Sequence, residues 1–148
     1  EKLRAATVDD VGGIFDLLQP LENEGILVRR SREHLELEID CFRVLDADGL
    51  IIGTAALYAF PETGAAEIAC LALHPDYRGS GRGDQILEHM EALALRRGHP
   101  KVFVLTTRTA QWFQERGYRQ GSIADLPPKR QALYNQARNS RVFVKDLA

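Results

Sequence analysis

The first helix of the chain is predicted by the spacing of its apolar residues. They recur at i, i+3, i+4 and i+7, the period of one helix face, at Val11, Ile14, Phe15 and Leu18. Thr7 offers a hydroxyl N-cap, and Asp10 three residues later completes a capping-box pattern. Pro20 predicts the end of this helix, because proline lacks the backbone N–H that a helix interior needs. A second helix is expected to begin at Ser31.

Other segments show the alternating or continuously apolar pattern of β-strands. Asp48-Gly49 joins two of them and favours the backbone of a tight hairpin turn. Residues 101–106 are too continuously apolar for a solvent-facing strand. The predicted strands cover residues 3–6, 42–45, 50–58, 66–73, 101–106, a segment near Tyr118, and 141–145.

Three more helical segments complete the pattern. One follows a glycine-rich turn and runs to about residue 97, one covers residues 109–116, and a helical turn follows Pro128. The resulting order of strands and helices predicts the α/β class, with a mixed central sheet flanked by helices. No internal repeat and no Gly/Ser/Pro linker divides the chain, so residues 1–148 are expected to form a single domain.

Composition narrows the function classes. Of the 148 residues, 45% are hydrophobic and 27% charged, the mix of a soluble globular protein, and the net charge of −2 argues against a nucleic-acid binder. No apolar run approaches the roughly 18 residues of a membrane span. Cys41 and Cys70 stand in no paired motif, and the 4 histidines have no metal-ligand spacing. A reduced cytoplasmic protein without a metal is expected.

The most informative stretch, residues 71–84 (LALHPDYRGSGRGD), lies between a predicted strand and a predicted helix. Its three alternating glycines let backbone N–H groups approach a ligand, and the helix N-terminus adds unpaired donors with a partial positive charge. Arg78 and Arg82 add cations suited to phosphate oxygens. A surface loop that merely turns the chain is the alternative, but the coincidence of these features favours phosphate binding.

The spacing of this loop excludes two common phosphate-binding motifs. No Gly-Lys-Ser/Thr follows, as a P-loop requires, and G-x-G-x-G differs from the dinucleotide pattern G-x-G-x-x-G. Arg78-x-x-Gly81-x-Gly83 resembles the pyrophosphate loop of the GNAT family of acyl-CoA-dependent N-acetyltransferases. The resemblance covers nearly the whole chain, including residues 3–6 (LRAA) and 112–118 (WFQERGY).

Four further motifs narrow the resemblance to the acetyltransferase half of bacterial N-acetylglutamate synthase. They are residues 25–31 (GILVRRS), 67–70 (EIAC), 104–108 (VLTTR) and 133–140 (LYNQARNS). The usual member of that family also carries an N-terminal amino-acid-kinase-like domain. The chain, which begins at Glu1, is therefore expected to be an excised domain or a stand-alone short form. A kinase-like neighbouring domain and a homo-oligomer both stay open as its assembly.

The resemblance implies a reaction and its ligands. Acetyl-CoA is the cosubstrate, and its acetyl group passes to the α-amine of L-glutamate, the first step of arginine biosynthesis. The residues implied for acetyl-CoA binding are Leu71 and Leu73, through their backbones, with Arg78, Gly79, Ser80, Gly81, Arg82 and Gly83. Two alternatives stay open: a GNAT enzyme for another amine, and a non-catalytic module that senses acyl-CoA or amino acids.

Around the acceptor, the resemblance implies arginines and backbone groups. The residues are Arg30, Cys70, Leu105 and Arg138. A planar guanidinium can bind a carboxylate with two hydrogen bonds, which suits a dicarboxylic substrate. Arg30 and not its neighbour Arg29 is assigned to the acceptor, because one of two adjacent side chains commonly faces solvent. For all these arginines the alternative is a solvated surface side chain.

Glu67 is the candidate general base. It stands in an otherwise apolar run, and strand alternation puts it on the same side as Leu71 and Leu73. The resemblance implies that it takes the proton of the glutamate amine through water, a role that partial burial would suit. The alternative is an edge-strand glutamate, exposed to solvent or paired with an arginine.

The general acid is less well defined. Phe113 stands where GNAT enzymes often have a tyrosine, so the departing thiolate must take its proton from water or from another hydroxyl. Thr106 is the candidate donor, and its alternative role is that of a strand-end residue capping the next helix. Tyr118 is expected to be a core or wall aromatic, and His74 to be structural.

Overall fold

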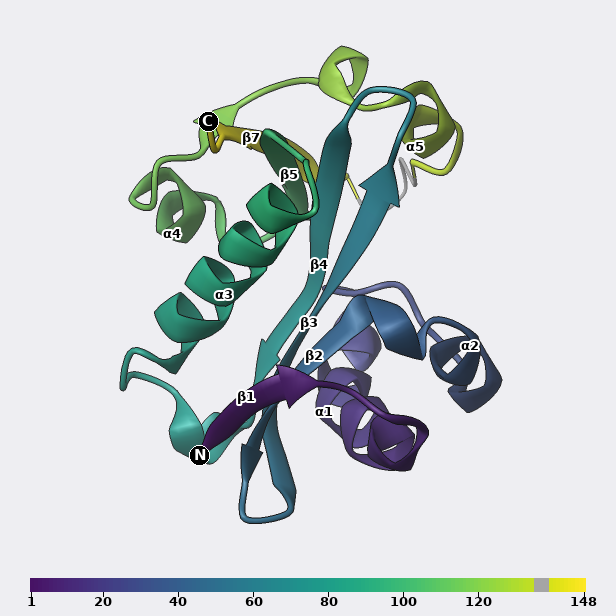
Figure 1. Cartoon of the computed structure of the whole chain (residues 1–148), viewed down its shortest axis with the longest axis vertical. Coiled ribbons are helices and arrows are strands. Elements are labelled where there is room, and N and C mark those ends of the chain that lie inside the picture. The colour runs from purple at the N-terminus through teal and green to yellow at the C-terminus, as the bar shows by residue number, and fades with distance from the viewer. Residues whose placement is uncertain (135–138) are drawn as a thin grey trace. The chain divides into compact units, whose positions relative to one another are not determined.

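The computed structural model describes residues 1–134 and 139–148, and these residues form a seven-stranded mixed β-sheet (Figure 1). Its strands are β1 (Lys2–Ala5), β2 (Phe42–Ala47), β3 (Leu50–Phe60), β4 (Ala65–Leu73), β5 (Lys101–Thr106), β6 (Arg119–Gln120) and β7 (Arg141–Asp146). They lie in the order β1-β2-β3-β4-β5-β7-β6, with β4 and β5 parallel and β5 and β7 antiparallel. The predicted α/β class with a mixed sheet is confirmed.

The helices are α1 (Val11–Asn23), α2 (Arg32–Leu37), α3 (Arg82–Arg96), α4 (Ala110–Gln114) and α5 (Pro128–Ala132). Each lies where the apolar spacing or the capping residues predict one. Among the described residues, no helix is both long enough and apolar enough to cross a membrane. Contacts divide the chain into two compact units, one made of Glu1–Leu57 and Cys70–Met90, the other of Tyr58–Ala69 and Glu91–Ala148.

In the first unit, an ion cluster ties β1 to the start of α1. The Arg4 guanidinium donates to both carboxylate oxygens of Asp10, at 2.8 and 2.9 Å, and also reaches Asp46 at 3.1 Å. The Thr7 backbone N–H donates to Asp10 at 2.8 Å, as the predicted capping box requires. The Arg4 guanidinium holds the pKa of the buried Asp10 carboxyl below its usual value, and the Thr7 amide adds a smaller effect in the same direction.

The predicted end of the first helix at Pro20 is wrong, because α1 continues through Pro20 to Asn23. Proline leaves the carbonyl four residues earlier without its helical partner, but that carbonyl belongs to the exposed Asp16, where water can replace the bond. The residue that stops the helix is Gly25, which lies two positions past Asn23 and has a φ of +74°. Gly25 and Ile26 donate their N–H groups to the carbonyls of Glu22 and Leu21, the Schellman pattern.

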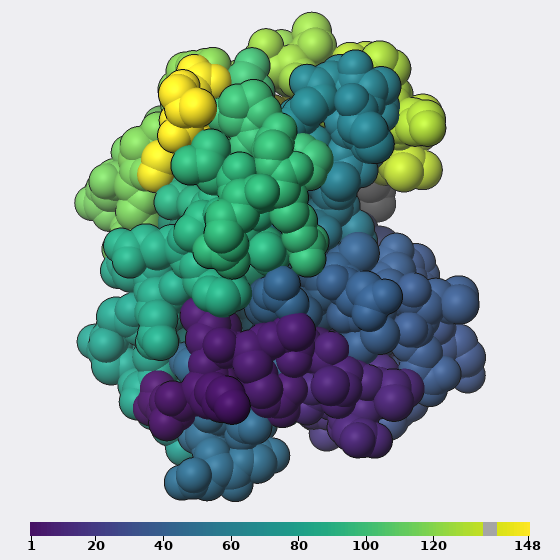
Figure 2. Space-filling view, viewed as in Figure 1, coloured from purple at the N-terminus to yellow at the C-terminus, as the bar shows by residue number. Residues whose placement is uncertain are grey.

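The β2–β3 hairpin follows from its turn residues. Asp48 and Gly49 have φ angles of +52° and +95°, the positive values that a two-residue turn of this twist needs. Ala47 pairs with Leu50 directly across the turn. Figure 2 shows this turn protruding at the lower edge of the view.

The second unit has its own apolar core on β4, β5 and β7. Phe103 and Val144 are each 1% exposed, and they pack with Ala65, Leu126 and Val142. Residues 102–104 of β5 are all buried, which confirms that this strand faces no solvent. Leu126 comes from the loop before α5, so the core anchors that loop to the sheet.

Parallel pairing between β4 and β5 is short. It runs from Ala65 and Lys101 to Glu67 and Phe103, although β5 continues to Thr106. Backbone groups beyond Glu67 and Phe103 are therefore not committed to this ladder. Farther along β4, Cys70 has a φ of +57°, an uncommon conformation for a residue with a side chain. The burial alternation of β4 nevertheless continues through this residue, since Ile68, Cys70 and Ala72 are buried and Ala69, Leu71 and Leu73 half-buried.

Candidate functional site

The glycine-rich loop connects β4 to α3, as the sequence predicts. A short 3-10 turn, Pro75–Tyr77, leads into it, and α3 begins at Arg82. Gly79 and Gly81 have φ angles of +81° and +83°, and a Cβ added to either would meet no atom within 4 Å. The loop is thus an open backbone surface at a helix N-terminus, with N–H groups available for an anion such as a pyrophosphate.

The two arginines of the loop differ in their surroundings. Arg82 is bound to the Glu1 carboxylate, with its Nε 2.9 and 3.0 Å from the two oxygens, and its guanidinium lies 5.1 Å from the centre of the Tyr77 ring. Arg78 is exposed and contacts the Leu73 carbonyl at 3.4 Å. A phosphate would have to replace Glu1 at Arg82, whereas the Arg78 side chain lies in solvent.

His74 has a structural role, as expected. Its Nδ1 accepts the Asp76 backbone N–H at 3.2 Å, and its ring lies edge-on to Tyr77, with 5.6 Å between ring centres. Leu71 and Leu73, at the end of β4, are half-buried. The histidine therefore shapes the turn that leads from β4 into the glycine loop.

Glu67 is buried, with 6% of its surface exposed, on a strand that lies between β3 and β5. The alternative of an exposed edge-strand glutamate is therefore wrong, but its other form, a glutamate paired with an arginine, is what the structure shows. Its carboxylate is paired with an arginine: Arg130 Nε donates to Oε1 at 2.6 Å, and Arg130 Nη2 donates to Oε2 at 3.4 Å. Sequence reasoning missed Arg130, because it lies 63 positions away on α5 and carries no local motif.

Thr106 ends β5 and is 7% exposed. Its hydroxyl lies 2.6 Å from the Thr109 hydroxyl and accepts the Thr109 backbone N–H at 3.0 Å. Because Thr109 is the N-cap of α4, this is the arrangement of a strand-end residue that supports the next helix. Leu105, the preceding residue, is half-buried and packs on the core of this unit.

Tyr118 belongs to the core, as expected, and is 3% exposed. Its hydroxyl donates to Glu91 at 2.7 Å, and Lys145 donates to the same carboxylate oxygen at 3.1 Å. Burial first, and the neighbouring Glu91 charge second, raise the pKa of the Tyr118 hydroxyl. The ring packs edge-on against Phe113, with 5.3 Å between centres, so this residue stabilises the unit and is not suited to protonate a thiolate.

The residues expected around the acceptor lie in different parts of the chain. Arg30 is half-buried, and its Nη1 donates to the Val28 carbonyl at 3.1 Å, whereas Arg29 is exposed and donates to Asn23 at 2.8 Å. Arg30 and the buried Cys70 belong to the unit of Glu1–Leu57 and Cys70–Met90. Arg138 lies outside the described residues.

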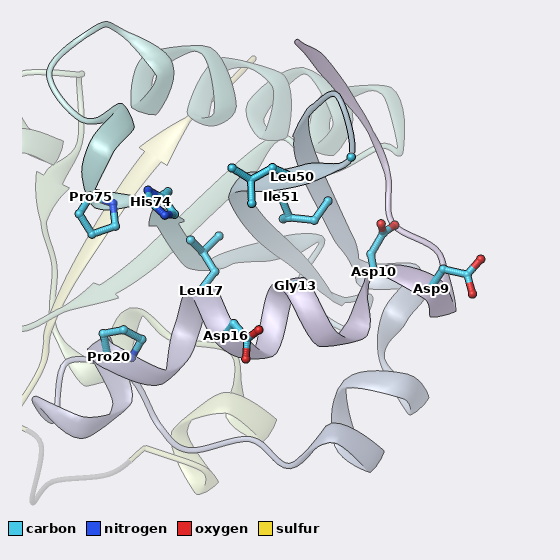
Figure 3. Close-up of a pocket in the computed structure, with 11 residues that line it drawn as sticks. Asp9, Asp10, Gly13, Asp16, Leu17, Pro20, Leu50, Ile51, His74 and Pro75 are labelled. Carbon is cyan, nitrogen blue, oxygen red and sulfur yellow. The ribbon is translucent and has the colours of Figure 1, made fainter.

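A cavity of about 450 Å³ lies in the first unit, between α1 and the start of β3 (Figure 3). Leu17 points toward Leu50 and Ile51 across it, and Asp9 and Asp16 are among the residues that line it. His74 and Pro75, which precede the glycines, also line it, but Glu67 and residues 78–83 do not. Because acetyl-CoA and glutamate are anions, a cavity lined by aspartates suits neither of them. Among the described residues, no group of three or more His, Cys, Asp or Glu could hold a metal ion.

A mixed sheet with a short β4–β5 ladder, an open glycine loop and a helix behind it defines an acyl-CoA-dependent N-acyltransferase fold. The family model for the acetyltransferase (GNAT) domain matches residues 38–120, more than half of the chain. The chain therefore belongs to the GNAT acetyltransferase family, which confirms the resemblance seen in the sequence.

Curated relatives narrow the likeness further. The chain is 55% identical over 148 residues to the amino-acid acetyltransferase of Aeromonas salmonicida, and 56% identical over 147 residues to that of Azotobacter vinelandii. The matched regions include 100% and 99% of this chain, but only 34% of each relative. The chain thus spans about a third of the length of these proteins.

Solved structures agree with this likeness. N-acetylglutamate synthase from Neisseria gonorrhoeae, complexed with coenzyme A and N-acetyl-glutamate, matches with a TM-score of 0.96 and 40% identity, over 99% of this chain and 35% of that one. The same synthase complexed with coenzyme A and L-arginine matches with a TM-score of 0.88 and 40% identity, over 99% of this chain and 33% of that one.

Proposed function

We propose that this chain transfers the acetyl group of acetyl-CoA to the α-amino group of L-glutamate and releases N-acetyl-L-glutamate. The observation that carries the proposal is its likeness, at a TM-score of 0.96, to a synthase that holds coenzyme A and N-acetyl-glutamate. The buried carboxylate of Glu67 supports it, because transfer to an amine requires a base. The reaction would serve the first step of arginine biosynthesis.

Acetyl-CoA binding is assigned to the loop between β4 and α3. The open backbone around Gly79 and Gly81 can bring N–H groups to the pyrophosphate, and the α3 N-terminus favours its negative charge. Arg78 is exposed and can add a cation, and Arg82 can do so once Glu1 yields to the phosphate. Ser80, Gly83 and the backbones of Leu71 and Leu73 complete the proposed set.

The chemistry assigned to Glu67 is proton removal. The substrate ammonium loses a proton to the Glu67 carboxylate through a water molecule, and the amine nitrogen attacks the thioester carbonyl carbon. The nitrogen of the tetrahedral intermediate gives up its second proton as the C–S bond breaks, and the coenzyme A thiolate takes a proton from water or from the Thr106 hydroxyl. The proton lost by the nitrogen replaces the one that this donor gave. Glu67 returns the first proton to solvent, so each turnover converts one ammonium and one thioester into one amide, one thiol and one released proton.

Recognition of the acceptor is assigned to arginines. Glutamate brings two carboxylates, and each needs donors once it leaves water. Arg30 and Arg138 are proposed to bind them, and backbone groups of Cys70 and Leu105 are proposed as further acceptor contacts. Arg30→Ala or Arg138→Ala is expected to lower kcat/KM for glutamate by about 10–150-fold, the loss of a charge-assisted hydrogen bond, with acetyl-CoA affinity nearly unchanged.

An acceptor panel tests the function directly. Initial rates are measured with acetyl-CoA and L-glutamate, L-aspartate or L-lysine, and the product is identified by mass. Glutamate should be the best acceptor, aspartate poor because it is one methylene shorter, and lysine poorer still because of its added positive charge. Equal use of lysine and glutamate would indicate a GNAT enzyme for another amine. Acetyl-CoA binding without turnover of any acceptor would indicate a sensing module.

A further inference from the structure

An ion pair joins Glu67, the proposed base, to Arg130, to which the proposed chemistry gives no role. The two side chains are 15% and 8% exposed, so little water reaches them. The Nε–Oε1 distance of 2.6 Å is short for a charge-assisted hydrogen bond. At such low exposure the bond from Arg130 holds the carboxylate in one orientation, because an electrostatic hydrogen bond is stronger in a buried place than in bulk water.

The backbone that carries Arg130 is itself fixed to the sheet. Leu126, just before α5, packs in the same core as Phe103, the register partner of Glu67 on β5. Gln131 Nε2 donates to the Leu126 carbonyl at 2.8 Å, which ties α5 to that anchor. On the far side of α5, the hydroxyl of Tyr134 donates to the carbonyl of the buried Ser140. Arg130 therefore stands on a short segment that is held at both ends.

We propose that Arg130 is a positioning residue for the general base. It binds Oε1 closely and leaves Oε2, at 3.4 Å, as the more weakly held oxygen of Glu67. Oε2 is then the atom that accepts the amine proton through water, since each carboxylate oxygen can accept two hydrogen bonds. The inference rests on the proposed acetyl transfer. It also links the base to Tyr134, which follows α5 (Pro128–Ala132) closely in the chain.

The test is Arg130→Met, a substitution that keeps much of the side-chain volume and removes every donor. We expect kcat to fall on the order of 10²-fold, the scale of a misplaced catalytic group, with KM for both substrates changed far less. Arg130→Lys keeps the cation but not the fork, so it should recover part of the lost kcat. Lys129→Met, an exposed neighbour on the same helix, is the matched control and should behave as wild type.

A double variant separates positioning from folding. If Arg130 acts through Glu67, Arg130→Met in a Glu67→Gln background should lower kcat no further. An additive loss in the double variant, or a rise in KM for glutamate at unchanged kcat, would overturn the positioning role. If Arg130→Met does not fold, Arg130→Lys decides alone: an intermediate kcat supports the role, and an unchanged kcat overturns it. A wild type that acetylates no amino acid overturns the proposed function instead.

Discussion

Replacing the Glu67 carboxylate by an amide is the sharpest test of the proposed chemistry. Glu67→Gln keeps the size and shape of the side chain but cannot accept the amine proton. Loss of a positioned acid–base group lowers the rate by about 10²–10⁴-fold, equivalent to roughly 2.7–5.4 kcal/mol of activation free energy. Acetyl-CoA affinity should stay near that of wild type, because the proposed pyrophosphate contacts are made by another segment.

The structure also predicts the accompanying change in stability. The glutamine oxygen can still accept a hydrogen bond from Arg130 Nε, so the variant loses a charge-assisted bond and not the whole contact. Exchanging a charge-assisted hydrogen bond for a neutral one destabilises by about 1–1.5 kcal/mol. For a chain of 148 residues this lowers the melting temperature by roughly 2–6 °C. The variant should therefore be folded at 25 °C.

The assay must separate these two effects. The turnover number is measured at saturating acetyl-CoA and glutamate, well below the melting temperature of the variant, and acetyl-CoA binding is measured by calorimetry. Glu62→Gln, the same change at an exposed glutamate in the β3–β4 turn, serves as the control and should keep wild-type kcat. A folded Glu67→Gln enzyme that retains most of its kcat would refute the assignment of Glu67 as the base.

Three further predictions test other parts of the molecule. Gly81→Ala places its Cβ in open space but strains a backbone at φ +83°, so it should shift the loop locally and weaken acetyl-CoA binding about tenfold or more by calorimetry. Asp10→Asn should destabilise by about 1.5–3 kcal/mol in urea unfolding near pH 7. Arg4 lowers the pKa of Asp10 in the folded protein, so the difference in unfolding free energy should be complete above pH 4, about the pKa of Asp10 in the unfolded chain. It should shrink as the pH falls through the pKa of the folded state. A stability difference that persists in strong acid would contradict this. Tyr118→Phe should lower kcat by less than roughly 10²-fold, the loss expected for a general acid, because the Tyr118 hydroxyl donates to Glu91. A larger loss in a folded variant would indicate that Tyr118 is the general acid.

Local chemistry along the chain was enough to predict most elements. Turn residues with positive φ, such as Gly49, mark their own positions because few other residues adopt that backbone conformation at low cost. The glycine loop and the helix after it were likewise predicted, since glycine spacing and a helix start are properties of neighbouring residues. The end of α1 differs from the prediction because Gly25, and not Pro20, is the residue that stops this helix. Proline near a helix end removes one bond that water can replace on an exposed face, whereas glycine supplies a conformation that ends the helix.

The identity of the family was also contained in the sequence. The loop from Arg78 to Gly83 and the motif at 67–70 depend on residue types at fixed spacing, and the family model confirms the resemblance they carry. The apolar neighbours of Glu67 in the sequence already showed that a carboxylate at this position is unusual. Its surroundings were not visible, because they are made by a segment 63 residues away.

Only the tertiary structure decided how the buried charges are partnered. Arg130 meets Glu67, Tyr118 and Lys145 meet Glu91, and no spacing rule connects these positions in sequence. The positive φ of Cys70 was likewise not visible in the sequence. A buried charge must find a partner wherever the fold brings one, because leaving it alone in a dry interior costs more than any local preference. The sequence therefore determined the elements and the chemical class, and the packing of distant segments determined which side chains act on one another.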